Sequence, residues 1–179
     1  MKLNTYCRPD YALVGLRDLI QELPPSVTMV EVGSFAGESA EEFLKHEKIL
    51  HLHAVDPWQN GYDPNDPASS VTGLPYIEAE FDFRMKAFPS RWTKHRLPSD
   101  VAVKNFKDRS LDFVYIDAVH TFDGVISDIT YWLPKVRIGG FIGGHDYDCT
   151  VFPGVVKAVN KVFGSPDKTF SEHSWIKAV

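Results

Sequence analysis

The sequence predicts a doubly wound α/β domain whose sheet is mostly parallel. From Val27 to Phe163, short apolar runs rich in β-branched residues alternate with stretches of helical periodicity, the order expected of right-handed crossovers between parallel strands. The chain has 179 residues, of which 44% are hydrophobic and 24% charged, and these values suit one globular domain with a single core. We therefore expect residues 1–179 to form one domain.

The first half of the chain predicts two strand–helix units followed by an irregular stretch. Pro9 opens a helix whose apolar residues recur at helical spacing, and Pro24 and Pro25 end it. We expect further helices over 38–46 and 76–88, and strands over 27–32, 50–55 and 93–97. Residues 59–73 are rich in Asn, Asp, Pro and Gly and show no period, which predicts a long loop. We expect residues 58–90 to cap a pocket, although their aromatic side chains would equally suit a core: Trp58, Tyr62, Tyr76 and Phe81.

The second half predicts two more strand–helix units and a closing pair of strands. Residues 112–117, with the sequence Asp-Phe-Val-Tyr-Ile-Asp, form the clearest strand candidate, and a helical stripe follows over 122–133. Residues 140–144 predict a fifth strand and 155–163 a last helix. The tail, at Phe170 and over 175–179, predicts two closing strands.

Composition and charge narrow the classes of partner. The net charge is −5 and no block of Lys and Arg forms a basic stripe, which argues against nucleic acid because neutralising phosphates requires clustered cations. No apolar run is long enough to cross a bilayer, and residues 1–10 lack the apolar core of a signal peptide. Cys7 and Cys149 are far apart in sequence and predict free thiols. We expect a cytoplasmic protein that acts on a small molecule.

The residues that follow each predicted strand carry the functional signal, because ligands of open α/β sheets bind beyond the carboxyl ends of the strands. A glycine turn over 33–37 follows the first strand, and Asp56 ends the second. The turn lacks the three-glycine fingerprint and the Lys of phosphate-binding loops. Each feature alone suits a plain turn or a solvated carboxylate. Together they predict a nucleoside with a free ribose, and they favour S-adenosylmethionine (SAM) over NAD.

Two sequence blocks resemble a known family. Residues 30–37, Val-Glu-Val-Gly-Ser-Phe-Ala-Gly, resemble the first motif of class I SAM-dependent methyltransferases. Residues 111–147 resemble the small-molecule O-methyltransferase branch, which pairs an Ile-Asp-x-x-His strand end with a Gly-His-Asp-Tyr strand end. The resemblance covers most of residues 25–179. One departure is Ala118-Val119, where relatives commonly carry Gly-Asp, so any role of that missing carboxylate does not transfer.

The resemblance implies a seven-stranded sheet whose last strand is antiparallel. It also implies a cofactor site in which the turn at Gly33 meets the methionine part of SAM, Asp56 meets the ribose, and the loop at Ser99 lies near the adenine. The cofactor-binding residues expected on this basis are Glu31, Gly33, Ser34, Phe35, Gly37, Asp56, Pro57, Trp58, Ser99, Asp100 and Asp117.

The chemistry requires an aligned acceptor and a route for its proton, since the sulfonium already makes the methyl group transferable. His120 is the first candidate for the base, with Asp117 and His145 as further catalytic candidates. The resemblance also implies a divalent cation, Mg²⁺ or another, held by Asp117 and Asp146. Structural alternatives stay open for these residues: His120 would only start a helix, and the two carboxylates would hold backbone amides. We interpret His46, His51 and His53 as surface or core residues.

The leading hypothesis is therefore a SAM-dependent methyltransferase that acts on a small-molecule hydroxyl. A second hypothesis is a non-catalytic SAM-binding or assembly protein on the same fold, because a fold does not guarantee its usual activity. A third is an NAD-dependent enzyme, which the missing phosphate fingerprint disfavours. The sequence leaves homo-oligomerisation and the identity of the acceptor open.

Overall fold

The computed structural model describes residues 10–61, 63–66, 72–148 and 150–179. Cys7, Cys149 and Tyr62, the residues of the predicted free thiols and of a predicted covering tyrosine, lie outside the described residues. Within the described part of the chain, no helix is long and apolar enough to cross a membrane.

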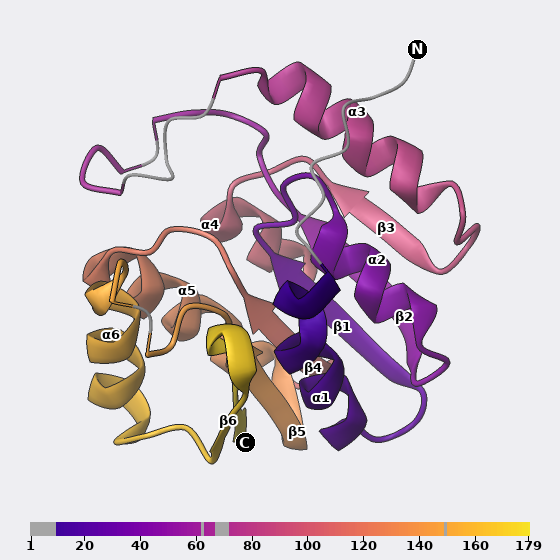
Figure 1. Ribbon diagram of the computed structural model, residues 1–179. Helices are drawn as coiled ribbons and strands as arrows, with labels where there is room; N and C mark the ends of the chain where they lie inside the picture. Colours follow the sequence, from indigo (N-terminus) through magenta and orange to yellow (C-terminus); the bar gives the residue numbers. More distant parts are fainter. Residues whose placement is uncertain (1–9, 62, 67–71, 149) are drawn as a thin grey trace.

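A seven-stranded sheet forms the centre of the molecule (Figure 1). Its strands, in spatial order, are β3 (Trp92–His95), β2 (Ile49–Val55), β1 (Val27–Val32), β4 (Leu111–Ile116), β5 (Val136–Gly144), β7 (Trp175–Ala178) and β6 (Lys168–Thr169). Every pair from β3 to β5 is parallel, whereas β7 runs antiparallel to both of its neighbours. The predicted fold class, including the antiparallel last strand, is confirmed.

Helices cover both faces of this sheet, as Figure 1 shows. One face carries α1 (Val14–Glu22), α2 (Glu38–Lys45) and α3 (Leu74–Met85), and the other carries α4 (Ser99–Ala102), α5 (Phe122–Trp132) and α6 (Pro153–Phe163). Short 3-10 turns occur at Asp10–Leu13, Val103–Asn105, Leu133–Lys135 and Ser171–His173. The chain therefore has the three layers of a doubly wound fold.

The central strands are mostly apolar because both of their faces are covered. In β4, Phe113 and Tyr115 point into the core under α1 and α2, while Val114 and Ile116 point into the core under α5 and α6. Met29 and Val30 divide in the same way in β1. This two-sided burial explains why the sequence shows continuous apolar runs at both strands.

Most predicted bounds are within three residues of those observed, and three elements show other differences from the prediction. The four-residue helix α4 was not predicted, because four residues are too few to show a helical period. Strand β5 begins at Val136, four residues before the predicted start at Gly140, so that Gly139 lies within the strand. Gly139 has a φ of 75°, a value that glycine adopts without strain. The first closing strand, β6, comprises only Lys168–Thr169, just before Phe170.

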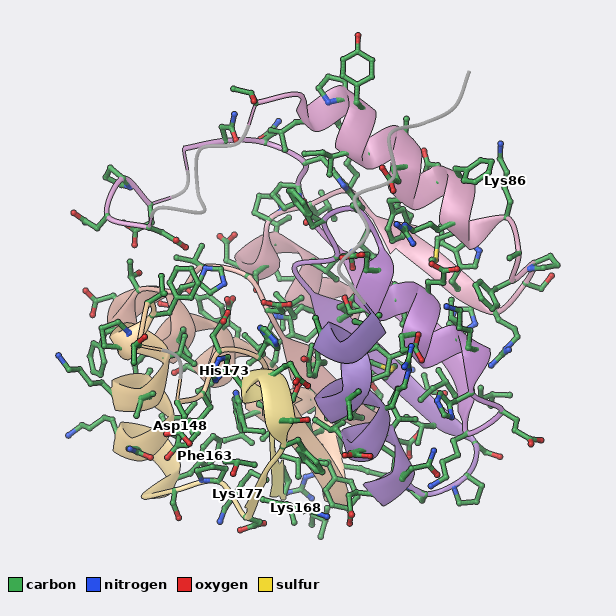
Figure 2. All side chains as sticks on the ribbon, viewed as in Figure 1. Lys86, Asp148, Phe163, Lys168, His173 and Lys177 are labelled. Carbon is green, nitrogen blue, oxygen red and sulfur yellow. The ribbon has the colours of Figure 1, made fainter. Side chains whose placement is uncertain are left out.

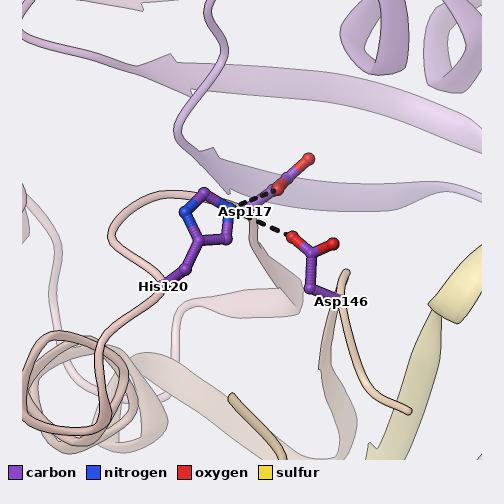
Figure 3. A group of neighbouring side chains, drawn as sticks. All are labelled: Asp117, His120 and Asp146. Atoms are coloured by element: carbon purple, nitrogen blue, oxygen red, sulfur yellow. Dashed lines mark ion pairs between the residues drawn. The ribbon is translucent and has the colours of Figure 1, made fainter. Parts of the chain in front are cut away.

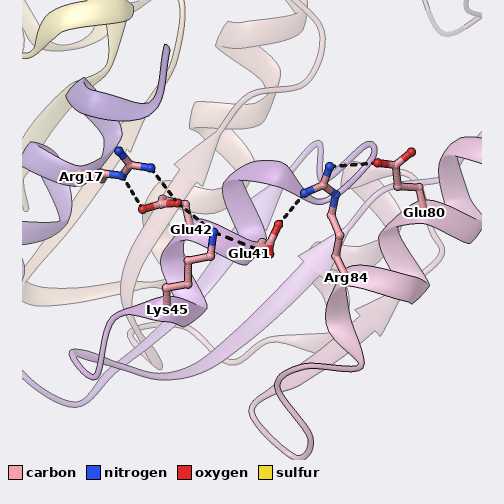
Figure 4. Close-up of polar contacts among 6 residues, drawn as sticks. All are labelled: Arg17, Glu41, Glu42, Lys45, Glu80 and Arg84. Atoms are coloured by element: carbon pink, nitrogen blue, oxygen red, sulfur yellow. Dashed lines mark hydrogen bonds and ion pairs between the residues drawn. The ribbon is translucent and has the colours of Figure 1, made fainter. Parts of the chain in front are cut away.

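An ion-pair network joins the three helices of one face (Figure 4). Arg17 of α1 donates to Glu42 of α2 at 2.6 Å, and Arg84 of α3 contacts Glu41 of α2 at 2.5 Å and Glu80 of its own helix at 2.9 Å. Lys45 lies 3.4 Å from Glu42. Because Glu42 and Glu80 are buried, these partners offset the cost of removing two carboxylates from water.

The remaining charges lie mostly at the surface, away from this network. Figure 2 shows Lys86 projecting beyond the end of α3, while Lys168 and Lys177 lie far from it near the C-terminal strands. Lys168 pairs with Glu22 and Lys177 with Asp167, each at 2.5 Å. Exposed pairs of this kind contribute little to stability.

Candidate functional site

A pocket of about 590 Å³ opens beyond the carboxyl ends of β1, β2 and β4, where open α/β sheets bind their ligands. Its wall includes most of the residues predicted from the sequence: Gly33, Ser34, Phe35, Gly37, Asp56, Pro57, Ser99, Asp100, Asp117 and His120. The volume falls in the range usual for small-molecule sites. Four chain segments that are far apart in sequence therefore meet at one cavity.

The turn after β1 requires glycine for a steric reason. Gly33 has a φ of 93°, and a Cβ atom at this position would lie 1.9 Å from the carbonyl oxygen of Asp117. Gly37 has a φ of 81° and directly precedes α2. The turn can thus pass close to the end of β4 and then enter the helix, which places backbone amides beside the pocket.

Asp56 fastens this turn to the end of β2. One carboxylate oxygen, Oδ2, accepts the backbone N–H of Phe35 at 2.9 Å, and Oδ1 accepts that of Trp58 at 2.6 Å. Burial raises the pKa of Asp56, an effect that these two hydrogen bonds oppose. Each carboxylate oxygen offers two acceptor positions, so Asp56 keeps the capacity to accept hydroxyl protons of a ligand.

Two predicted cofactor residues do not reach the pocket wall. Glu31 lies inside β1 and is fully buried, because alternation along the strand turns its side chain away from the face of Val30 and Val32. Trp58 packs in the core with its ring centroid 5.1 Å from that of Phe81, and its Nε1 donates to the carbonyl oxygen of Phe35. Trp58 and Phe81 are therefore core residues, whereas Tyr76 is 66% exposed.

The predicted adenine end of the pocket contains a carboxyl group that the sequence did not reveal. Ser99 Oγ donates to Asp128 Oδ1 at 2.5 Å and accepts the indole N–H of Trp132 at 2.8 Å. Burial, together with the negative charge of Asp100, raises the pKa of Asp128 to about 6, against the lowering effect of the Ser99 hydrogen bond. Asp128 lies in the middle of α5, away from any strand end. The available signal was its place beside the apolar stripe of Val125 and Ile129.

His120 lies at the other end of the pocket, among carboxylates (Figure 3). Its Nε2 is 3.0 Å from Asp146 Oδ2 and 3.7 Å from Asp117 Oδ1. Its Nδ1 is 3.0 Å from Asp66 Oδ2, and the same oxygen accepts the His120 backbone N–H at 2.7 Å. The ring also stacks on Phe152, with centroids 4.1 Å apart. Neither Asp66 nor Phe152 was predicted as a site residue.

These neighbours hold His120 in its charged form. Burial works to lower its pKa, but hydrogen bonds to Asp117 and Asp146 and their negative charges raise the pKa of His120 to about 11. Burial works to raise the pKa of Asp117 and of Asp146, yet the hydrogen bonds to His120 keep both pKa values below the ordinary aspartate value. An imidazolium cannot accept a proton, so the base role predicted for His120 requires that one proton leave first.

The same cluster contains a set of groups suited to a metal ion. One ligand atom each from Asp117, His120 and Asp146 lie within 4.8 Å of one another, and carboxylate oxygen with imidazole nitrogen is a common donor set for divalent cations. His145 lies behind this group: its Nδ1 is 3.2 Å from Asp146 Oδ1, and it lines a smaller cavity instead of the main pocket.

The other histidines considered in the sequence lie elsewhere. His53 Nδ1 is 3.1 Å from His95 Nε2, and His51 Nε2 is 2.9 Å from Thr93 Oγ1, at the edge formed by β2 and β3. Burial lowers the pKa of His53 to about 4, which keeps this histidine neutral. These side chains are not among those that line the pocket.

A sequence profile for a family described as a methyltransferase domain matches residues 30–147. Among curated proteins, an uncharacterized protein of Acanthamoeba polyphaga mimivirus is 28% identical to this chain over 144 residues. The alignment covers 76% of this chain and 59% of that protein, so the chain spans less than two thirds of the length of this relative.

Solved structures share the fold at low sequence identity. The O-methyltransferase NovP superposes with a TM-score of 0.57 at 14% identity, over 94% of this chain and 78% of that one. Spermidine synthase from Thermotoga maritima has a TM-score of 0.57 at 15% identity, over 93% of this chain and 57% of that one. At such identities the likeness concerns the fold, and the profile match over the pocket-forming segments carries the assignment to a family.

Proposed function

This chain belongs to the methyltransferase-domain family, and on that premise we propose that it transfers a methyl group from SAM to a small-molecule acceptor, with a hydroxyl oxygen as the attacking atom. The observation that carries the proposal is the single pocket in which the glycine turn, Asp56 and the Asp117–His120 pair meet. A cofactor and an acceptor bound there would lie side by side, which is the arrangement that a direct transfer requires.

The pocket fits SAM in shape and chemistry. Ser34 Oγ is buried, lines the pocket and has no hydrogen-bond partner among the described residues, so it is available to a polar group of the methionine part. Asp56 would accept the ribose hydroxyls. Ser99, Asp100 and Asp128 would surround the adenine. The described pocket wall contains no Lys or Arg, which suits a cofactor that has no phosphate groups.

The charge of the pocket supports a particular class of acceptor. Seven acidic residues line it, namely Glu38, Asp56, Asp63, Asp66, Asp100, Asp117 and Asp128, against His120 as the one basic residue on the described wall. Such a field attracts the positively charged SAM and repels anions. We therefore propose an acceptor without phosphate or carboxylate groups.

The transfer itself exchanges one covalent bond for another. The acceptor oxygen forms a bond to the methyl carbon, the carbon–sulfur bond breaks with its electron pair going to sulfur, and S-adenosylhomocysteine is released. We propose that the acceptor hydroxyl donates to Asp117, the cluster carboxylate that faces the pocket, and that its proton passes to this carboxylate as the methyl group arrives. The fixed positive charge of His120 would orient the acceptor oxygen.

The three-residue donor set also supports a proposal for a divalent cation. Asp117, Asp146 and, once its Nε2 has lost a proton, His120 would hold it, and when bound it would lower the pKa of the acceptor hydroxyl. The test is to titrate Mg²⁺ and Mn²⁺ into chelator-treated protein by calorimetry. Binding that disappears in Asp146→Asn would support the site, and no heat with either ion would reject it.

The charged state of His120 favours one alternative function. A cluster that holds no neutral base in this arrangement is compatible with a protein that binds SAM without turning it over. Under this alternative the pocket would bind S-adenosylhomocysteine, but no acceptor would be methylated.

Two measurements in sequence test the proposal. Calorimetry with S-adenosylhomocysteine comes first, because the cofactor half of the pocket is the better defined. The second is transfer of a radiolabelled methyl group from SAM to a panel of small alcohols and phenols, with carboxylated and phosphorylated analogues as the comparison set. Binding with transfer to uncharged members supports the proposal. Binding without any transfer favours the alternative, and absence of binding rejects both.

A further inference from the structure

We propose that Asp66 is a positioning residue that fixes the imidazole of His120 at the edge of the pocket. Asp66 belongs to the segment between β2 and α3 and lies 54 residues before His120 in the chain. The inference rests on the proposed function, since it assigns Asp66 a role in orienting a residue of the reaction site.

His120 donates two hydrogen bonds to Asp66. A single oxygen, Asp66 Oδ2, accepts both the backbone N–H of His120 at 2.7 Å and its ring Nδ1 at 3.0 Å. One oxygen that holds both donors fixes the side-chain torsions of His120 relative to its own backbone. With Nδ1 donating to Asp66, the ring is oriented so that its other nitrogen, Nε2, lies 3.0 Å from Asp146 Oδ2.

The remaining freedom of the ring is removed by stacking. Phe152 lies against the imidazole at a centroid distance of 4.1 Å and an interplanar angle of 22°. Asp66 and Asp146 thus hold the two nitrogens in the ring plane while Phe152 holds the plane itself. Of these contacts, Asp66 alone comes from the segment before α3 that forms part of the pocket wall.

Burial indicates that the contact does more than attach a loop. The side chain of Asp66 is 1% exposed, and a carboxylate with so little access to water must gain charge-assisted hydrogen bonds to be stable there. A simple attachment of the segment would need only the backbone N–H. The second donor, Nδ1, is the one that sets the orientation of the ring.

A neighbouring residue of the same segment provides a matched comparison. Asp63 Oδ2 accepts the hydroxyl of Thr121, the residue after His120, at 2.5 Å. Asp63 therefore links the same two chain segments as Asp66 does, but without contacting the imidazole. Asp63→Asn should therefore loosen the segment to a similar degree and leave the His120 ring in place.

The test uses nitrogen-15 histidine NMR on the 179-residue chain and its Asp66→Asn, Asp66→Ala, Asp63→Asn and His120→Gln variants. His120→Gln assigns the Nδ1 proton signal by its loss. In the wild type we expect this proton to resonate downfield and to exchange slowly with solvent. Asp66→Asn should move it upfield and speed its exchange about tenfold, since an amide oxygen is a weaker acceptor than a carboxylate, and Asp66→Ala should remove it. Asp63→Asn should leave it unchanged.

Two further readouts separate positioning from folding and from the proposed function. Thermal unfolding checks that each variant is folded, and calorimetry of the wild type with S-adenosylhomocysteine tests the proposed function separately. An unaltered Nδ1 signal in the Asp66 variants, or an equal loss in Asp63→Asn, would overturn the inference. If the wild type binds no S-adenosylhomocysteine, the proposed function fails and takes the inference with it. If the wild type does bind S-adenosylhomocysteine, the Nδ1 signals of the variants test the role of Asp66 separately from the proposed function.

Discussion

At the residue scale, the pocket is defined by carboxyl groups that their surroundings set to different charge states. Asp117 stays ionised because the positively charged ring of His120 lies 3.7 Å from its carboxylate, whereas burial raises the pKa of Asp128 to about 6. Burial also raises the pKa of Asp56, whose carboxylate links the ends of β1 and β2. Within one cavity, aspartate therefore serves as a stable anion at Asp117, as a group that titrates near pH 6 at Asp128, and as a link between two strand ends at Asp56.

The proposed ribose contact leads to the first prediction. Asp56→Asn keeps the volume of the side chain but replaces one acceptor oxygen with a donor. We expect its affinity for S-adenosylhomocysteine to fall about 10- to 100-fold, the range for losing a hydrogen bond to a charged group. Calorimetry measures this, and Asp108→Asn, which alters only an ion pair with Lys135, is the control. Equal affinity in the two variants would remove Asp56 from the cofactor site.

Asp128 provides a prediction of pH dependence. Its folded pKa of about 6 is above the ordinary 3.8, so its contribution to stability is complete below pH 3.8 and is lost as the pH rises through 6. Asp128→Asn lacks this titration. The free energy of unfolding of the wild type should therefore fall relative to that of the variant between pH 4 and pH 7, by on the order of 3 kcal/mol. Urea denaturation measures both free energies of unfolding. If the difference between the wild type and Asp128→Asn were the same at the two pH values, the assignment would be contradicted.

The sequence could identify site residues only where a general rule placed them. Gly33, Asp56 and Asp117 follow strands, so the rule for strand ends located them correctly at the pocket. Asp66 and Asp128 reach the pocket from an irregular segment and from the middle of a helix. Nothing in their local sequence reports the distant residue that each one meets, because that contact exists only after the chain has folded.

At the scale of elements, the turn between β1 and α2 is the part of the site with the strictest geometry. Gly33→Ala places a Cβ atom 1.9 Å from the Asp117 carbonyl oxygen at a φ of 93°. We expect the variant to lose at least about 2 kcal/mol of stability and to bind S-adenosylhomocysteine poorly, because β1 and β4 must separate.

Gly164→Ala is the matched control for this steric effect. Gly164 also has a positive φ, 76°, but a Cβ atom there meets nothing within 4 Å. It should cost about 1 kcal/mol, the backbone penalty alone. Chemical denaturation compares the two variants, and an equal loss in both would show that the close approach of β1 and β4 has no energetic consequence.

The network on the helical face gives a prediction for packing. Arg84→Met leaves Glu80, which is 3% exposed, without the charge that lies 2.9 Å away. The variant should be destabilised by about 3 kcal/mol, since a buried carboxylate loses its partner. Adding Glu80→Gln in the same chain should recover much of this loss. If the double variant were no more stable than Arg84→Met, the buried charge would not be the cause.

Elements were predictable in proportion to their length and burial. Strand β4 is apolar on both faces and stood out clearly, and the stripe of α5 was long enough to show its period. The short α4 and the glycine-containing start of β5 were not recognised. In both cases sheet packing and hydrogen bonding to neighbours, which local sequence does not report, determine the conformation.

At the scale of the whole molecule, the fold brings four distant segments to one edge of the sheet. The parallel order of β2, β1 and β4 aligns their carboxyl ends, and the segment before α3 adds the wall that carries Asp63 and Asp66. The number of strands and the antiparallel last strand were predicted from resemblance to a family and not from periodicity, because local patterns contain no information on strand pairing.

The central claim is that these strand ends form one site for an adenosyl ligand. Calorimetric titration of the wild type with S-adenosylhomocysteine tests it most directly. We predict one binding site per chain, with affinity reduced in Asp56→Asn and retained in Asp108→Asn. Absence of binding up to about 1 mM, the limit of a weak specific complex, would contradict the account.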